Sequence, residues 1–227
     1  MARCRGFAWV AGLIAGVVAF GLGEAVDQWH APELVPQNLS GGEVMVETFE
    51  TIAEADARNA ALAFGLLGGS LGLAFGLAGG MAGGSVVRGL MAAGGGLVLG
   101  SLLGVILPLI VVVPYFKLQQ WRNSDDLLVP LAMHSLIWGM LGAVGGLAWG
   151  LGRGGEILRP VLFALVGACL GTAGFEALGA AIDPLALTTD PVSKTWPTRL
   201  LARILVATTV GVMVGLSVRP RNRLPAS

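Results

Sequence analysis

Six stretches of this chain are long, apolar and almost free of charge, and they limit the possible fold more than any other feature. They cover roughly residues 7–25, 60–80, 89–113, 129–151, 160–181 and 200–218. A helix needs about 20 mostly apolar residues to cross a hydrocarbon core about 30 Å thick. The 227 residues are 55% hydrophobic and 12% charged, whereas a soluble domain carries about 25% charge. We therefore predict a polytopic membrane protein.

Segments of this length are predicted to be helices rather than barrel strands. In hydrocarbon every backbone N–H and C=O group must be bonded within the protein, which leaves helices and closed barrels. A barrel strand spans about 9–11 residues and alternates in polarity, and the six stretches do neither. The predicted fold class is an all-α integral membrane protein, with one membrane domain over residues 1–227.

The second and fourth stretches repeat one glycine-rich pattern. Residues 61–78 read ALAFGLLGGSLGLAFGLA and residues 135–152 read SLIWGMLGAVGGLAWGLG, with nine of eighteen positions identical. Glycines recur every four residues and so share one helix face, at Gly68, Gly72, Gly76, Gly80, Gly142, Gly146, Gly150 and Gly154. Small residues at this spacing let helix backbones approach closely in lipid. We predict glycine-zipper packing faces; the alternative is the lining of a narrow path or of a ligand site.

Weaker matches link the remaining stretches to this pair. They predict three tandem helical hairpins of the same orientation, beginning near Arg5, Arg88 and Arg159. Each hairpin crosses the membrane twice and returns the chain to its starting side, so the internal repeats are parallel. Pro108 lies within the third stretch and is predicted to kink it, because proline removes a backbone donor.

Charged residues divide unevenly between the two sets of loops that six crossings create. One set, with both termini, holds eight of the fourteen basic residues and one of the fourteen acidic residues. Lysine and arginine near short loops remain on the cytoplasmic side. We therefore predict a protein of the cytoplasmic (inner or plasma) membrane with both termini in the cytoplasm. An alternative for the first stretch is a signal peptide cleaved after Ala25.

The longest predicted outer segment covers residues 26–59. Ser40 and Glu43 fit a capping box. Glutamates then follow at spacings of four, three and four, at Glu43, Glu47, Glu50 and Glu54. This spacing predicts an acidic amphipathic helix that leads into the second span. Its acidic face is interpreted as solvated, with a docking surface or a divalent-cation site as the alternative.

Ionisable side chains within the spans are the first candidates for function, because lipid makes them costly unless they are paired or hydrated. Such residues are predicted near the outer helix ends, at Glu24, His134, Glu176 and Arg203. Glu176 and Arg203 lie at similar depth on helices joined by one loop, so we predict an ion pair between them. The simpler interpretation of this cluster is a set of boundary and inter-helix contacts. The functional interpretation is an outward vestibule in which Glu176 binds a cation or a proton.

Catalytic motifs are weak. GGSLG at residues 68–72 matches the nucleophile elbow, but that motif requires a turn between a strand and a helix and here it lies in a glycine-rich apolar stretch. The chain contains two histidines and two cysteines, His30, His134, Cys4 and Cys169, too few and too scattered for a zinc site. We predict no enzyme activity, metal or cofactor, and no nucleic-acid partner.

Two classes of function remain after these exclusions. The first is a structural or accessory membrane protein whose partners are the lipid bilayer and either a second copy of itself, as a homo-oligomer, or another membrane protein. The second is a small transporter or channel for a cation, a proton or a small solute, favoured by the internal repeats and by Glu176 and Arg203.

Overall fold

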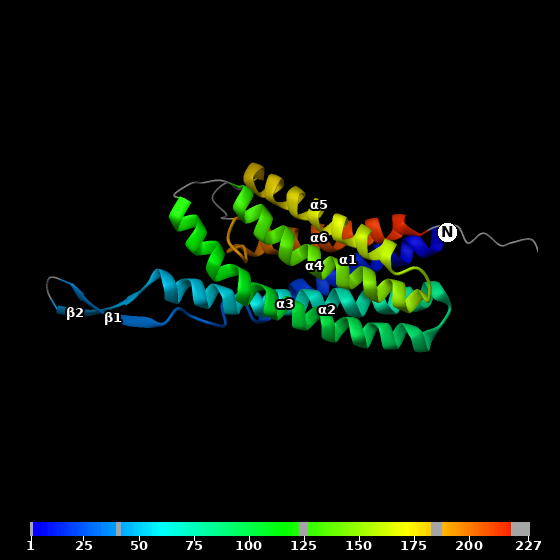
Figure 1. Ribbon diagram of the computed structural model, residues 1–227, viewed down its shortest axis with the longest axis horizontal. Coiled ribbons are helices and arrows are strands. Elements are labelled where there is room, and N and C mark those ends of the chain that lie inside the picture. Colours follow the sequence, from blue (N-terminus) through cyan, green and yellow to red (C-terminus); the bar gives the residue numbers. More distant parts are fainter. Residues whose placement is uncertain (1, 40–41, 123–126, 183–187, 219–227) are drawn as a thin grey trace, which may run out of the picture.

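Six helices make up most of the computed structural model, which describes residues 2–39, 42–122, 127–182 and 188–218 (Figure 1). They are α1 (Ala2–Ala25), α2 (Phe49–Gly83), α3 (Val86–Arg122), α4 (Leu128–Arg153), α5 (Leu158–Ile182) and α6 (Trp196–Ser217). All six contain a segment long and apolar enough to cross a membrane. The prediction of an all-helical, multi-pass membrane protein with six spans is confirmed at this level.

Successive helices run in opposite directions along one axis (Figure 1). The start of α1 and the end of α6 lie at one end of the bundle, which we call the terminal end. A two-stranded antiparallel sheet, β1 (Leu34–Leu39) and β2 (Gly42–Glu47), projects from the other end, which we call the hairpin end. The loops between α2 and α3 and between α4 and α5 therefore lie at the terminal end.

Five of the helices close a ring. α1 packs against α2, α2 against α4, α4 against α5, α5 against α6, and α6 against α1. α3 lies outside the ring, against α2 and α4. Large side chains without exposed surface fill the core between the helices, including Phe75, Ile137, Trp149, Phe175 and Val210.

The outward face of α3 is apolar and open. Val87, Met91 and Ile110 are each more than 60% exposed, as suits a helix surrounded by lipid. α3 is bent in the part that lies near the hairpin end (Figure 1). It contains Pro108 and Pro114. Proline within a helix removes a hydrogen bond and clashes with the preceding turn, so the two prolines account for the bend.

The glycines singled out in α2 face the backbone of α3. They are Gly68, Gly72, Gly76 and Gly80. A Cβ atom added to Gly68 would collide with the carbonyl oxygen of Gly100, and one added to Gly72 with that of Gly96. The two helices are therefore in backbone contact along this face, and a side chain there would push them apart.

Glycines of α4 make a similar contact with α5. A Cβ atom added to Gly146 would collide with the carbonyl oxygen of Pro160, and one added to Gly142 would lie 2.8 Å from the Cβ of Ala168 and 2.9 Å from the carbonyl oxygen of Ala164. Gly150 is close to the turn that precedes α5. Backbone and alanine methyl groups, rather than glycine, complete this contact on the α5 side.

Gly154 does not belong to the packing face to which the sequence pattern assigned it. It ends α4 with φ +68°, and its N–H group donates to the carbonyls of Gly150 and Leu151. Glycine adopts this left-handed conformation without steric cost. Its role is therefore that of a helix C-cap, which the spacing of four had concealed.

Substitution of neighbouring glycines in α3 should separate packing from helix propensity. An added Cβ at Gly96 would lie 2.7 Å from the carbonyl oxygen of Gly72 and 2.9 Å from the Cβ of Ala148. An added Cβ at Gly95 would meet no atom of another helix within 4 Å. We expect Gly96→Ala to lower the free energy of unfolding by about 1–3 kcal/mol. Gly95→Ala should be neutral or stabilising by up to about 1 kcal/mol. Thermal unfolding in detergent measures both, and equal effects would contradict backbone contact at Gly96.

The predicted acidic helix begins later than expected. Residues 42–47 form strand β2 rather than a helical turn, so Glu43 and Glu47 do not share a stripe with the two glutamates of α2. The alternation of Val44 and Val46 favours a strand, since β-branched residues lose side-chain freedom in a helix. Ser40, half of the predicted capping box, lies outside the described residues.

Helix α2 has its own capping box, which begins at Thr48 rather than at Ser40. The hydroxyl of Thr48 accepts from the N–H of Thr51, and the N–H of Thr48 donates to the hydroxyl of Thr51. From there the helix continues for 35 residues without interruption. The prediction that a helix leads directly into the second span is confirmed from Phe49 onward.

Candidate functional site

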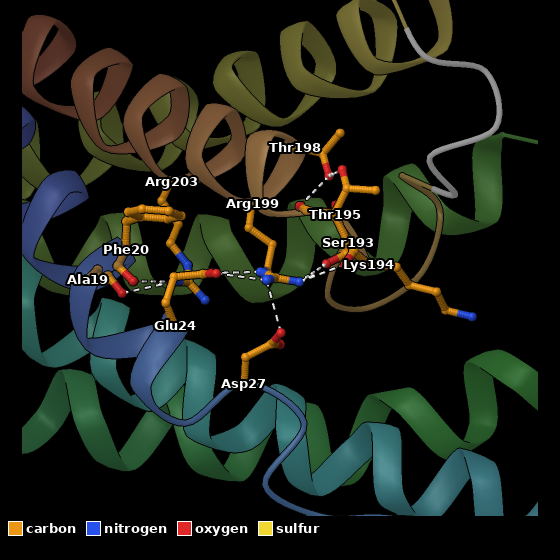
Figure 2. Close-up of polar contacts among 10 residues, drawn as sticks. All are labelled: Ala19, Phe20, Glu24, Asp27, Ser193, Lys194, Thr195, Thr198, Arg199 and Arg203. Atoms are coloured by element: carbon orange, nitrogen blue, oxygen red, sulfur yellow. Dashed lines mark hydrogen bonds and ion pairs between the residues drawn. The ribbon is translucent and has the colours of Figure 1, made fainter.

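Arg199 joins three segments at the hairpin end (Figure 2). Its Nε donates to Oε1 of Glu24 at 2.7 Å and its Nη2 to Oε2 of the same carboxylate at 2.8 Å. Nη2 also lies 2.9 Å from Oδ2 of Asp27, and Nη1 donates to the carbonyls of Ser193 and Lys194. Every donor nitrogen is engaged, so this arginine holds the end of α1 and the segment before α6 together.

Arg203 lies one turn deeper on the same face of α6, and its bonding is incomplete. Its Nη1 donates to the carbonyls of Ala19 and Phe20 in α1 at 2.9 and 3.1 Å (Figure 2). Its guanidinium packs on Gly23, where any Cβ atom would collide with it. Nε and Nη2 donate to no described residue, and no carboxylate in the described part of the chain lies within ion-pairing distance. A side chain only 5% exposed thus makes no direct ion pair with a described residue, and the nearby carboxylates of Glu24 and Asp27 act on it only at longer range.

A cavity of about 260 Å³ opens beside these arginines, between the ends of α1, α2 and α6 and residues 190–194. We call it the vestibule. Its wall includes three carboxylates and three cationic side chains, Asp27, Asp56, Asp190, Lys194, Arg199 and Arg203. Charges of both signs are therefore gathered in one open cavity at the hairpin end.

The acidic side of the vestibule is only partly balanced. Nζ of Lys194 lies 3.3 Å from Oδ2 of Asp190. Burial nevertheless raises the pKa of the Asp190 carboxyl, and the nearby Lys194 ammonium opposes the shift without cancelling it. Asp56 lines the same wall within electrostatic reach of both groups. No hydrogen bond or ion pair joins its carboxylate to a described residue.

A second, smaller cavity of about 20 Å³ continues from the vestibule into the bundle. We call it the neck. Ala63, Val192, Ser193, Arg199 and Arg203 line both cavities. The rest of the neck is largely aromatic, from Phe64, His134, Trp138 and Phe175. Its volume is sufficient for about one water molecule.

His134 and Glu176 form a buried pair beside the neck. Nδ1 of His134 lies 2.6 Å from Oε1 of Glu176, and the two residues are 2% and 6% exposed. A proton must lie between these atoms, whichever of them carries it. The second carboxylate oxygen, Oε2, is buried without a partner among the described residues, as is Nε1 of Trp138.

The predicted ion pair between Glu176 and Arg203 is wrong. Glu176 bonds His134 instead, and Arg203 turns toward α1. The prediction assumed that α6 faces α5 at this point, but α6 packs against α1 as well as α5, and Arg203 bonds the backbone of α1. Glu24, expected in the same cluster, is held by Arg199.

Several polar residues at or near the vestibule were not singled out from the sequence. Asp27, Asp56 and Asp190 reach the vestibule from three different segments. Tyr115 is buried at 4% exposure and donates to the carbonyl of Thr189 at 2.7 Å. The spacing of four between Arg199 and Arg203 was the available signal, since it places two arginines on one helix face.

Metal-ligand geometry is not evident at the site. Within the described ranges, no group of three or more histidine, cysteine, aspartate or glutamate side chains is arranged to hold a metal ion. Comparison with known proteins found no family model that matches the chain, and no curated protein or solved structure similar to it.

Proposed function

We propose that this protein moves a small polar solute or protons across the membrane, with the vestibule as the binding site and the His134–Glu176 pair as a protonatable group. The single observation that supports this function most strongly is that Arg203 and His134 line one neck, directly below a charged cavity. Ionisable groups within membrane spans are rare, and they mark substrate, ion and proton pathways.

The proposed orientation places the hairpin end outside the cytoplasm. The terminal end carries Arg3, Arg5, Arg88, Arg153 and Arg159, and positively charged loops remain in the cytoplasm. The vestibule would then face outward in the cytoplasmic membrane. Below the neck the core is closed by buried aromatic and aliphatic side chains, so the conformation described here corresponds to a state closed toward the cytoplasm.

The helix architecture fits this proposal. We interpret the α2–α3 glycine contact and the sequence repeat as a glycine zipper within three tandem hairpins of the same orientation. Backbone contact between α2 and α3 makes this pair a stiff unit. Movement would then fall outside this pair, for example at the sparse contact between α4 and α6 across the ring.

Proton flux into proteoliposomes tests the proposal. A potassium gradient with valinomycin sets the membrane potential, and an enclosed pH dye reports proton entry. We expect wild-type flux above that of empty liposomes, and we expect Glu176→Gln to reduce it about tenfold or more, since the pair loses its proton-carrying carboxylate. Glu54→Gln, at an exposed site on α2, is the matched control and should keep the wild-type rate.

Equal flux in wild-type, Glu176→Gln and empty liposomes would contradict a proton pathway. An accessory role would then be the better explanation. The projecting hairpin would be its contact surface, because Leu34, Val44 and Met45 are about half exposed and an isolated two-stranded hairpin is only marginally stable.

A further inference from the structure

The vestibule contains one cationic and one anionic side chain that no described residue pairs directly. Arg199 is committed to Glu24 and Asp27, and Lys194 to Asp190. Arg203 and Asp56 remain, and both line the vestibule. Neither makes an ion pair with a described residue. A bound solute that carries both charges can supply a direct partner to each.

We propose that the vestibule binds a small zwitterionic solute that carries a carboxylate and an ammonium group, as a small amino acid does. Arg203 receives the carboxylate through Nε and Nη2, which donate to no described residue. Asp56 receives the ammonium group, with Asp190 close by. This assignment rests on the proposed function and specifies the class of solute that it acts on.

The chemistry of the two side chains favours this class over simpler ions. A guanidinium with free donors matches the two oxygens of a carboxylate. A simple anion would leave Asp56 unpaired, and a simple cation would leave Arg203, which is only 5% exposed, unpaired. A desolvated charge without a partner is costly. A zwitterion satisfies both groups and adds no net charge to a site within the membrane boundary.

The size of the vestibule limits the solute. Pockets for drug-sized ligands run from about 300 to 1,000 Å³, whereas the vestibule is about 260 Å³. The neck below it has a volume of about 20 Å³ and aromatic walls. The solute is therefore a compact molecule with at most a small apolar group that could point toward Phe64, Trp138 and Phe175.

Ligand-induced stabilisation of the full-length protein in detergent tests the assignment. The probes are glycine and alanine, compared with acetate and methylammonium, which each carry one of the two charges. We expect the amino acids to raise the unfolding temperature and the single-charge probes to leave it unchanged at equal concentration. Calorimetric titration then gives the affinity of each variant for the amino acid that stabilises most.

Two substitutions remove the proposed contacts one at a time. Arg203→Gln and Asp56→Asn should each weaken binding roughly thirtyfold or more. Asp56 is half-buried, so Asp56→Asn is expected to fold. It keeps the assignment testable if Arg203→Gln does not fold. Glu54→Gln, two residues earlier on α2, should bind as the wild type does.

Each other result overturns the assignment. Acetate that binds as tightly as glycine and is lost in Arg203→Gln would make the vestibule an anion site. No binding by any of the four probes would exclude this solute class. A failure of the proposed transport function gives a different result. Glycine would then still bind in detergent, but the wild type and Glu176→Gln would show equal proton flux in proteoliposomes.

Discussion

Replacing Arg199 with methionine is expected to lower the free energy of unfolding by about 3 kcal/mol, because it leaves two carboxylates without their counter-ion. The lost interactions are the bidentate pair with Glu24, the contact with Asp27 and the bonds to the carbonyls of Ser193 and Lys194. The carboxylates are about one quarter exposed. Water therefore compensates in part, and the expected cost lies at the lower end of the range for a buried pair.

Lys194→Gln is the matched control. Its ammonium group is 63% exposed and pairs with Asp190 at 3.3 Å, so its loss should change stability by less than about 1 kcal/mol. Hydrogen exchange should also separate the two variants. In Arg199→Met the amides at the end of α1 and before α6 should exchange faster, because the side chain that joins them is gone. A stability equal to that of Lys194→Gln would show that Arg199 is not the link between these segments.

The number of spans and their alternation could be predicted from the sequence because they depend on one quantity, the length of apolar chain. Lipid forces each such segment to satisfy its backbone within itself, so helix was the only choice. The glycine faces could also be predicted, since a spacing of four places residues on one helix face whatever lies opposite. The neighbour that each glycine face contacts could not be predicted. The neighbour of α2 along its glycines is α3, while the glycines of α4 meet Pro160 and the alanines of α5.

The hairpin was missed because two patterns overlap in the same residues. Glu43 and Glu47 continue the helical spacing of Glu50 and Glu54, but Val44 and Val46 alternate as in a strand. Turn geometry decided between them, since Gly42 adopts φ +136°, which only glycine tolerates easily. Helix spacing in charged residues is weak evidence by itself, because a solvated glutamate has no required partner.

The partners of the charged residues depend on rotation about each helix axis, which the sequence does not specify. Glu176 and Arg203 were placed at compatible depths, yet one faces α4 and the other α1. Contact between the first and last helices brings Glu24 to Arg199 across 175 residues. Such a contact is set by closure of the ring, and no local pattern in either helix encodes it.

Replacing His134 with leucine is expected to lower the free energy of unfolding by about 3 kcal/mol, because Glu176 then remains buried without any partner. Its Oε1 now bonds Nδ1 of His134, and its Oε2 already lacks a described partner. The double variant His134→Leu/Glu176→Leu should recover most of this loss, since two apolar side chains of similar volume need no counter-ion. Chemical unfolding of the wild type, both single variants and the double variant measures the coupling between the two positions.

The same four proteins distinguish a structural clamp from a proton site. A clamp contributes through stability alone, so the double variant, once stable, should carry protons as well as the wild type does. A proton site contributes through the carboxylate and imidazole themselves, so the double variant should be stable and inactive. We expect the double variant to be stable but to carry no proton flux, because His134 lines the neck directly beneath the charged vestibule. Stability together with wild-type flux would reduce the pair to an inter-helix contact between α4 and α5.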